Sequence, residues 1–409
     1  MTTSFSAVDP ALGYLYQVRL ALLWSLRRAR TSGTDFIVSL ESLDDVAFES
    51  SGGSPEDLLQ AKHHRNREAT LTNASSDLWK SLRVWFEGYA AKQVPLSATR
   101  YLLTTGVAPA KSAASLLRSE GRDIEKALQL LVAITQTSEN NSNAKAYEAF
   151  LAAPATARKT ILQNVVVIDG APTVVTIDED IKKEIRWSAQ EEHLDAFARR
   201  LEGWWFDRVI KQLDDPTGAS GIHGTEIDQV IDELREQFKP ENLPIDPDLT
   251  NYLLDERIKT AHADSPFVHQ LKLVAAGDDR VASAMRNYYR AFEQRSRWMR
   301  EHLLLVGELT RYDDKLIEEW EQAFLAAKDE IPPTAVEDEK RKVGRQILSK
   351  TEEVRLPVRP DVTESFVVRG SFQMLADEAK VGWHPDYRDL LPSFYKPLQP
   401  DDSTKGGDK

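Results

Sequence analysis

The chain contains no cysteine among its 409 residues. This absence excludes disulfides, cysteine nucleophiles and thiolate metal sites, and it fits a reducing compartment. Long apolar runs are also missing, because runs such as residues 303–306 fall far short of the roughly 20 residues that cross a bilayer. The first ten residues show neither a basic segment nor an apolar stretch typical of a signal peptide. We therefore expect a cytoplasmic protein without membrane contact.

Positive charge is scarce as well, since the net charge is −13. Proteins that coat nucleic acid without selectivity are usually basic. The charge is uneven, however: residues 1–110 hold 11 Lys or Arg and 11 Asp or Glu, so the later part carries the whole acidic excess. The first part is therefore neutral enough to approach a polyanion.

Several familiar catalytic motifs are missing. The sequence has no G-x-x-x-x-G-K-[ST], no H-E-x-x-H and no G-x-S-x-G, so nucleotide hydrolysis, zinc-protease chemistry and serine-hydrolase chemistry have no support. We expect no residues that bind an organic cofactor. Any ATP dependence would come from a partner.

The first 110 residues predict a small mixed α/β core. Residues 9–30 have helical apolar spacing, and residues 36–40, 44–50 and 57–64 are typical of strands. The last two strands flank a glycine- and proline-containing turn and predict a hairpin. A helix at 75–90 and a buried strand at 98–106 complete the order α-β-β-β-α-β.

A group of polar residues gathers on this predicted hairpin: Glu41, Asp44, Asp45, Gln60 and Lys62. Gln60 and Lys62 are two positions apart and share a strand face, which the hairpin brings beside Asp45. A hard cation such as Mg²⁺ or Mn²⁺ prefers carboxylates with neutral oxygens, and a lysine beside it can orient water and neutralise a phosphoryl group. A polar turn followed by a solvated lysine would give the same spacing, so the pattern alone leaves both interpretations open.

Four segments, at residues 13–17 (GYLYQ), 41–45 (ESLDD), 58–64 (LLQAKHH) and 71–85 (LTNASSDLWKSLRVW), resemble a known nuclease family. The family is the PD-(D/E)xK-type double-stranded-DNA endonuclease with a Q-x-K third motif, as in effectors of cyclic-oligonucleotide-sensing bacterial defence. The segment 368–387 resembles the C-terminal part of ABC-three-component anti-phage systems, which include Lamassu.

These resemblances imply a fold class and four regions. The fold is α/β, with a restriction-endonuclease-like mixed-sheet nuclease domain at 1–185, followed by a mostly helical partner-docking domain at 186–350. A short C-terminal tail segment at 351–395 is expected to contain β structure. We expect residues 396–409 to be disordered.

The resemblance implies that Asp45, Gln60 and Lys62 are catalytic. The chemistry of the pattern adds Glu41 as a fourth catalytic candidate, because its charge could replace the one that a glutamine lacks. Asp45, Gln60 and Glu41 would bind the metal, with Asp44 as the alternative to Asp45. Gln17 and His63 are possible supporting residues.

The implied function is a metal-dependent DNA endonuclease that acts against phage. An SMC-like ATPase and a small third subunit would restrain it, and release with homo-oligomerisation would activate it. Two alternatives stay open, a non-catalytic assembly subunit that retains the nuclease fold and an RNA-cleaving nuclease.

One later helix, expected over about 278–308, combines six arginines with interleaved aromatic residues. Such a mixture can bind nucleic acid. The acidity of the surrounding region favours a subunit interface instead.

Overall fold

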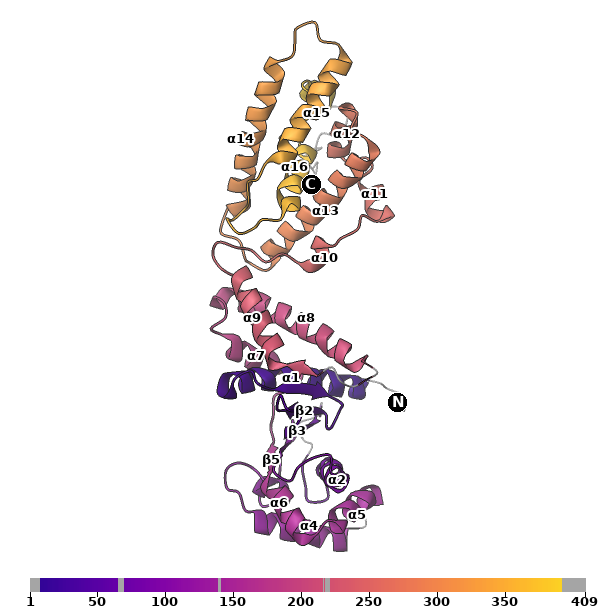
Figure 1. Cartoon of the computed structure of the whole chain (residues 1–409), viewed down its shortest axis with the longest axis vertical. Helices are drawn as coiled ribbons and strands as arrows, with labels where there is room; N and C mark the ends of the chain where they lie inside the picture. Colours follow the sequence, from indigo (N-terminus) through magenta and orange to yellow (C-terminus); the bar gives the residue numbers. More distant parts are fainter. Residues whose placement is uncertain (1–7, 65–69, 139–140, 216, 218–220, 392–409) are drawn as a thin grey trace, which may run out of the picture. The chain divides into compact units, whose positions relative to one another are not determined.

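The computed structural model describes residues 8–64, 70–138, 141–215, 217 and 221–391. The chain divides into two compact units (Figure 1), unit 1 up to Arg235 and unit 2 from Glu236. The disorder expected at 396–409 lies outside the described residues. No helix in the described ranges combines the length and apolar character that crossing a membrane requires.

A six-stranded mixed sheet forms the centre of unit 1, with the strand order β5-β4-β3-β2-β1-β6. Neighbours from β6 through β3 are antiparallel, whereas β3–β4 and β4–β5 are parallel. The strands are β1 (Ile37–Leu40), β2 (Val46–Glu49), β3 (Pro55–Lys62), β4 (Thr99–Thr104), β5 (Val165–Ile168) and β6 (Ile222–His223).

Helices cover the sheet of unit 1 on both faces (Figure 1). The helices are α1 (Val8–Ser32), α2 (Ser76–Ala90), α3 (Ala113–Leu116), α4 (Ile124–Thr137), α5 (Ala144–Ala152), α6 (Ala155–Gln163), α7 (Ile177–Ile185), α8 (Leu194–Leu213) and α9 (Gly224–Gln237). The predicted order α-β-β-β-α-β is confirmed from α1 to β4.

The apolar stripe of α2 explains its position against the sheet. Leu78, Leu82 and Trp85 recur at helical spacing and are fully or almost fully buried. They join one core with Leu58 of β3 and Leu102 of β4. Burying side chains of this size contributes about 1.5–3 kcal/mol each, so this core fixes α2 beside the β2–β3 hairpin.

Helices α7 and α8 belong to unit 1 because they pack on α1. Arg19 of α1 pairs with Glu202 of α8 at 2.8 Å, and Trp205 Nε1 donates to the Val18 carbonyl at 2.8 Å. The boundary expected at residue 185 therefore lies inside a compact unit, which continues to Arg235.

The last strand of unit 1, β6, pairs with the first strand, β1. Next to this pair, the side-chain amide of Gln212 accepts from the Leu40 N–H at 3.1 Å and donates to the Leu40 carbonyl at 3.2 Å. Gly221 packs so closely that an added Cβ would lie 2.2 Å from Ile37 Cγ2. The sheet therefore needs residues well beyond 185 to be complete.

Unit 2 is helical throughout its described part. Its helices are α10 (Pro247–Thr250), α11 (Glu256–His262), α12 (Pro266–Leu273), α13 (Asp278–Arg300), α14 (Glu308–Asp329), α15 (Glu337–Glu353), α16 (Ser365–Asp377) and α17 (Tyr387–Leu390). The β structure expected in the tail at 351–395 is wrong, because α16 occupies its centre and no strand forms at 351–391. Helix α16 packs along α13, where Gly370 lies against the backbone of Asn287.

Four arginines of α13 make contacts inside unit 2. Arg280 pairs with Glu352, Arg290 donates to the carbonyls of Leu249 and Thr250, Arg295 pairs with Asp313, and Arg297 pairs with Asp246 and Asp248. Their abundance in the sequence therefore reflects intramolecular pairing, which leaves these four unavailable as a basic surface.

Candidate active site

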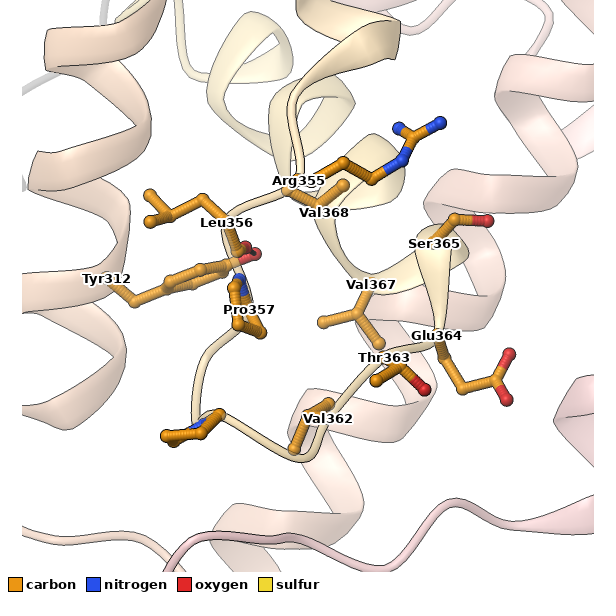
Figure 2. Close-up of a pocket in the computed structure, with 11 residues that line it drawn as sticks. Tyr312, Arg355, Leu356, Pro357, Val362, Thr363, Glu364, Ser365, Val367 and Val368 are labelled. Atoms are coloured by element: carbon orange, nitrogen blue, oxygen red, sulfur yellow. Dashed lines mark hydrogen bonds between the residues drawn. The ribbon is translucent and has the colours of Figure 1, made fainter.

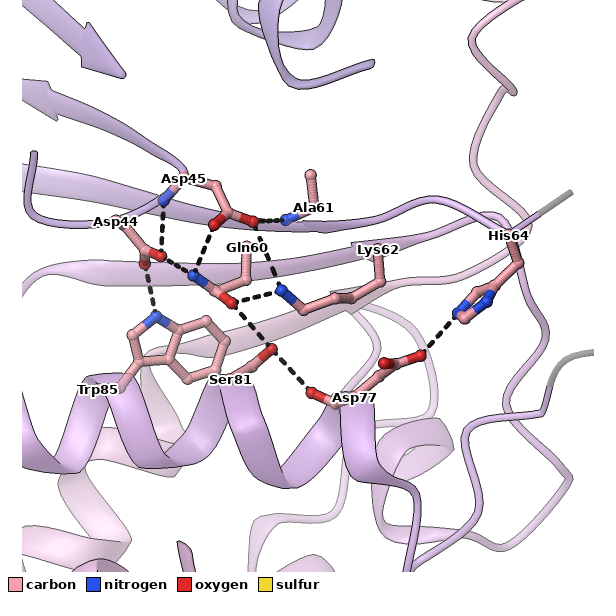
Figure 3. Close-up of polar contacts among 9 residues, drawn as sticks. All are labelled: Asp44, Asp45, Gln60, Ala61, Lys62, His64, Asp77, Ser81 and Trp85. Carbon is pink, nitrogen blue, oxygen red and sulfur yellow. Dashed lines mark hydrogen bonds and ion pairs between the residues drawn. The ribbon is translucent and has the colours of Figure 1, made fainter. Parts of the chain in front are cut away.

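Asp45, Gln60 and Lys62 come together on the face of the sheet that α2 covers (Figure 3). Asp45 immediately precedes β2, in which Ala47 pairs with Leu58 of β3. Because side chains alternate along a strand, Asp45 shares a face with Ala47, and Gln60 and Lys62 share a face with Leu58. Ala47 and Leu58 belong to the core against α2. The three polar side chains therefore lie on the same face of the sheet as this core, next to it at the end of the hairpin.

A short network joins the three polar side chains. Lys62 Nζ donates to Gln60 Oε1 at 2.7 Å and lies 3.5 Å from Asp45 Oδ2. Gln60 Nε2 donates to Asp45 Oδ1 at 3.2 Å, and the Ala61 N–H donates to Asp45 Oδ2 at 2.8 Å. The side chains of Lys62 and Asp45 keep 20% and 15% of their surface exposed. A carboxylate and an ammonium group are thus fixed side by side and remain accessible.

Asp44 has a different environment from its neighbour Asp45. Its side chain is buried, and it accepts hydrogen bonds from Trp85 Nε1 at 2.8 Å, from Gln60 Nε2 and from the Asp45 N–H. Burial raises the pKa of Asp44 to about 7, against the opposing effect of the hydrogen bonds from Gln60 and Trp85. Asp44 therefore holds the Gln60 amide through a buried hydrogen bond. The accessible carboxylate of the two is that of Asp45.

Glu41 brings a second accessible carboxylate to the site. Its backbone takes a left-handed conformation, with φ of 52°, and its N–H donates to the Asp45 carbonyl at 3.2 Å. Burial and the negative charge of Asp45 raise the pKa of Glu41, while Lys62 and a hydrogen bond from Gln17 lower it. The structure therefore brings Glu41 and Gln17 to the same site as Asp45 and Lys62.

The two histidines that follow Lys62 point to different faces. The His63 ring packs on Tyr16 of α1, with 5.2 Å between ring centroids. Burial and the neighbouring His64 lower the pKa of His63. His64 Nε2 lies 2.6 Å from Asp77 Oδ2 at the start of α2. His63, named from the sequence as supporting, thus lies on the α1 side, whereas His64 lies on the side of Lys62.

Helix α2 supplies three polar contacts that sequence reasoning missed. Trp85 binds Asp44, Asp77 binds His64, and Ser81 Oγ lies 2.9 Å from the Asp77 carbonyl and 3.4 Å from Gln60 Oε1 (Figure 3). The available signal was their spacing. Residues 77, 81 and 85 are four apart and therefore follow one stripe of the helix.

The donor set fits a hard divalent cation. Glu41 and Asp45 are close enough for the charge of Asp45 to raise the pKa of Glu41, so a cation would relieve the repulsion between them. Gln60 carries a neutral oxygen, a type that Mg²⁺ accepts beside one or two carboxylates. In the structure this oxygen accepts from Lys62, and the amide nitrogen faces Asp45, so the amide would have to turn to bind a cation. Within the described ranges, no three His, Cys, Asp or Glu side chains are grouped to hold a metal ion. A cation here would therefore depend on two carboxylates and the amide.

Unit 2 contains a separate small pocket of about 250 Å³ (Figure 2). Its lining is largely apolar and includes Leu356, Val362 and Val368, with Arg355 and Glu364 as its charged members. A single carboxylate without a histidine or a second acid offers no acid–base pair. The residues that the sequence suggested as catalytic all lie in unit 1.

Comparison with known proteins places one part of the chain in a family. No curated protein matches the chain. Residues 267–391, which include most of α12 and all helices from α13 to α17, match the family model for C-terminal domain 7 of the ABC-three component (ABC-3C) systems. The resemblance seen at residues 368–387 is confirmed and extends over a longer segment. Residues 267–391 of unit 2 are therefore similar to a C-terminal domain of the ABC-three component systems.

Proposed function

We propose that unit 1 is a metal-dependent DNA endonuclease of the PD-(D/E)xK type and that the chain is the nuclease subunit of an anti-phage ABC-three component system. The observation that carries this proposal is the convergence of Asp45, Gln60 and Lys62. Lys62 Nζ lies 2.7 Å from the Gln60 amide oxygen and 3.5 Å from the Asp45 carboxylate. Phosphodiester hydrolysis needs these groups together.

The order of elements supports a restriction-endonuclease-like fold for this site. Three antiparallel strands follow α1, and α2 then leads to β4, which runs parallel to β3. The polar groups lie where β2 begins and β3 ends. The site therefore occupies the end of the central hairpin, as the resemblance to Q-x-K nucleases implies.

Each residue has a proposed task. Asp45, Glu41 and Gln60 would hold Mg²⁺ or Mn²⁺, which when bound neutralises phosphoryl charge and lowers the pKa of water. Lys62 orients the attacking water and binds a phosphate oxygen. Asp44 positions Gln60 through its buried hydrogen bond.

The domain match in unit 2 supports a role within an assembly. A C-terminal domain of an ABC-three component system implies other subunits. We propose that an SMC-like ATPase and a small third subunit bind the chain and restrain the nuclease. Cleavage of both strands needs two active centres, and one unit 1 provides one, so the active form would pair nuclease units in a homo-oligomer.

The test is cleavage of supercoiled plasmid by the purified full-length chain, alone and with its partner subunits. We expect cleavage with Mg²⁺ or Mn²⁺ and none in excess EDTA. Lys62→Ala should abolish it, and the matched control Lys126→Ala, an exposed lysine on α4, should not. Cleavage of RNA but not DNA would favour the RNA-cleaving alternative. No cleavage under any of these conditions would favour a non-catalytic assembly subunit.

A further inference from the structure

A histidine–aspartate pair lies beside the candidate active site and has no part in the functions assigned above. His64 Nε2 is 2.6 Å from Asp77 Oδ2. The two side chains keep 32% and 23% of their surface exposed. Asp77 comes from the first turn of α2, the helix that also carries Ser81 next to Gln60. The pair is therefore held by the same two elements that build the site.

The main chain at His64 is fixed in place. The Thr105 hydroxyl accepts from the His64 N–H at 2.8 Å and donates to the His64 carbonyl at 3.1 Å. The Thr105 N–H in turn donates to the Lys62 carbonyl at 3.2 Å. Thr105 itself is buried. These hydrogen bonds continue the pairing of β3 with the end of β4 as far as His64. They fix the main chain of His64 relative to Lys62.

The chemistry of the ring suggests its ligand. Since Nε2 is used by Asp77, Nδ1 is the nitrogen that remains for a ligand. In its doubly protonated form the ring donates Nε2–H to Asp77 and can donate Nδ1–H to an anion. His64 and Lys62 are two positions apart along extended chain, about 7 Å. Two cationic donors at such a separation suit neighbouring phosphates of one nucleic-acid strand.

We propose that His64, held by Asp77, binds a backbone phosphate next to the one that Lys62 engages. This inference rests on the proposed nuclease function and deepens it. His64 would contribute to substrate affinity more than to the chemical step, because Lys62 and the carboxylates already account for the reacting phosphate. The ring of the neighbouring His63 packs on Tyr16 on the other side of the strand, so it is not placed to bind the same phosphate.

The experiment compares wild type with His64→Ala, His64→Arg and the control Lys126→Ala, an exposed lysine on α4. Cleavage of a short DNA duplex is measured over a range of KCl concentrations, and binding of the same duplex in EDTA is followed by fluorescence anisotropy. For His64→Ala we expect KM and the binding Kd to rise about 10- to 100-fold, as for a lost charge-assisted hydrogen bond, with kcat little changed. The slope of log affinity against log salt should become shallower by about one.

The two other variants separate contact from folding. His64→Arg keeps a cationic donor and should restore most of the affinity and the salt slope, while Lys126→Ala should leave the wild-type affinity and salt slope unchanged. An unchanged KM, Kd and salt slope in His64→Ala would overturn the inference, as would a thermal melting loss that fully accounts for weaker binding. Absence of metal-dependent cleavage in wild type would refute the proposed function instead, and the anisotropy slopes would still decide whether His64 binds phosphate.

Discussion

Asp44 and Asp45 are adjacent in the chain, yet their carboxylates have different partners. Asp44 is buried against Trp85 Nε1 at 2.8 Å, whereas Asp45 is bound by the Ala61 N–H at 2.8 Å and lies 3.5 Å from Lys62. The first carboxylate is a support for Gln60 and the second is the accessible group. This difference gives the doublet two separable roles.

Substitution of Asp45 should remove activity while the fold persists. In Asp45→Asn an oxygen remains to accept from Ala61, so we expect the free energy of unfolding to change by about 1 kcal/mol or less. Cleavage should fall by at least about 100-fold. Plasmid cleavage and urea unfolding on the same preparation check both expectations. Cleavage at the wild-type rate by both Asp45→Asn and Lys62→Ala would contradict the assignment of these residues to an active site.

Asp44→Ala should reduce the stability of the fold more than Asp45→Asn does and reduce cleavage less. It leaves the buried donors of Gln60 and Trp85 without their acceptor, which costs about 1–3 kcal/mol of stability. Cleavage should fall less than in Asp45→Asn, because the accessible carboxylate of Asp45 remains. Urea unfolding and cleavage rates compare the two variants. A greater loss of cleavage in Asp44→Ala, with intact folding, would make Asp44 the ligand.

The raised pKa of Asp44 predicts a pH-dependent stability. Its folded value is about 7 against 3.8 for the ordinary group, so the folded state binds an extra proton between these values. The stabilising contribution is complete below about pH 4 and is lost as the pH rises through about 7. In EDTA, the free energy of unfolding of wild type, minus that of Asp44→Asn, should therefore fall between about pH 4 and pH 7 and level off above it. A value of this difference that stays constant or rises between about pH 4 and pH 7 would contradict the raised pKa.

Metal binding should be visible without catalysis. A cation that binds only the folded state stabilises it, by about 2.7 kcal/mol at 100 times Kd. We expect Mn²⁺ to raise the thermal melting temperature of wild type by several degrees, of Glu41→Gln by less, and of Asp45→Asn by little. Differential scanning fluorimetry with and without EDTA measures these shifts. An equal rise in all three proteins would place the cation elsewhere.

The contact between α13 and α16 should be sensitive to one methyl group. A Cβ at Gly370 would lie 2.1 Å from the Asn287 carbonyl oxygen and 2.4 Å from Ala291 Cβ. We expect Gly370→Ala to cost about 1–3 kcal/mol. The control Gly203→Ala, in α8 with nothing within 4 Å of the new Cβ, should be neutral or stabilise by up to about 1 kcal/mol. Urea unfolding tests the pair, and similar effects would contradict the close packing.

Control by partners predicts a change of assembly state. If a partner restrains the nuclease, it must bind the restrained state more tightly than the active one. Mass photometry and cleavage assays on the same samples should show an active oligomer of the free chain and an inactive complex with the ATPase subunit. Full activity from a strictly monomeric chain, unchanged by the partner, would contradict this mechanism.

The hairpin and its residues were predictable because local signals agreed. The turn at Gly52, Gly53 and Pro55 fixed the strands on either side, and the alternation along β3 placed Gln60 beside Lys62. The distinct roles of Asp44 and Asp45 were not predictable, since they depend on Trp85, a residue brought close only by the packing of α2.

The tail shows where short patterns are ambiguous. Residues 366–368 form an apolar run with two valines, which suits a strand or a buried helix equally well. Here the tertiary contact with α13 favours the helix, because Gly370 allows the segment to lie close to α13 in that conformation. The extent of unit 1 was equally hidden, since β6 is two residues long and its partner β1 lies far back in the chain.

The pairing of β1 with β6, beside the contact of Gln212 with Leu40, determines how the protein can be divided for expression. A fragment ending at residue 185 would contain all the polar residues of the site, but it would leave β1 as an open sheet edge and remove α8 from α1. Such edges recruit strands from other molecules. Poor solubility of that fragment would therefore reflect a truncated sheet and would say nothing about the activity of the intact chain. A usable cloning boundary for unit 1 lies after α9.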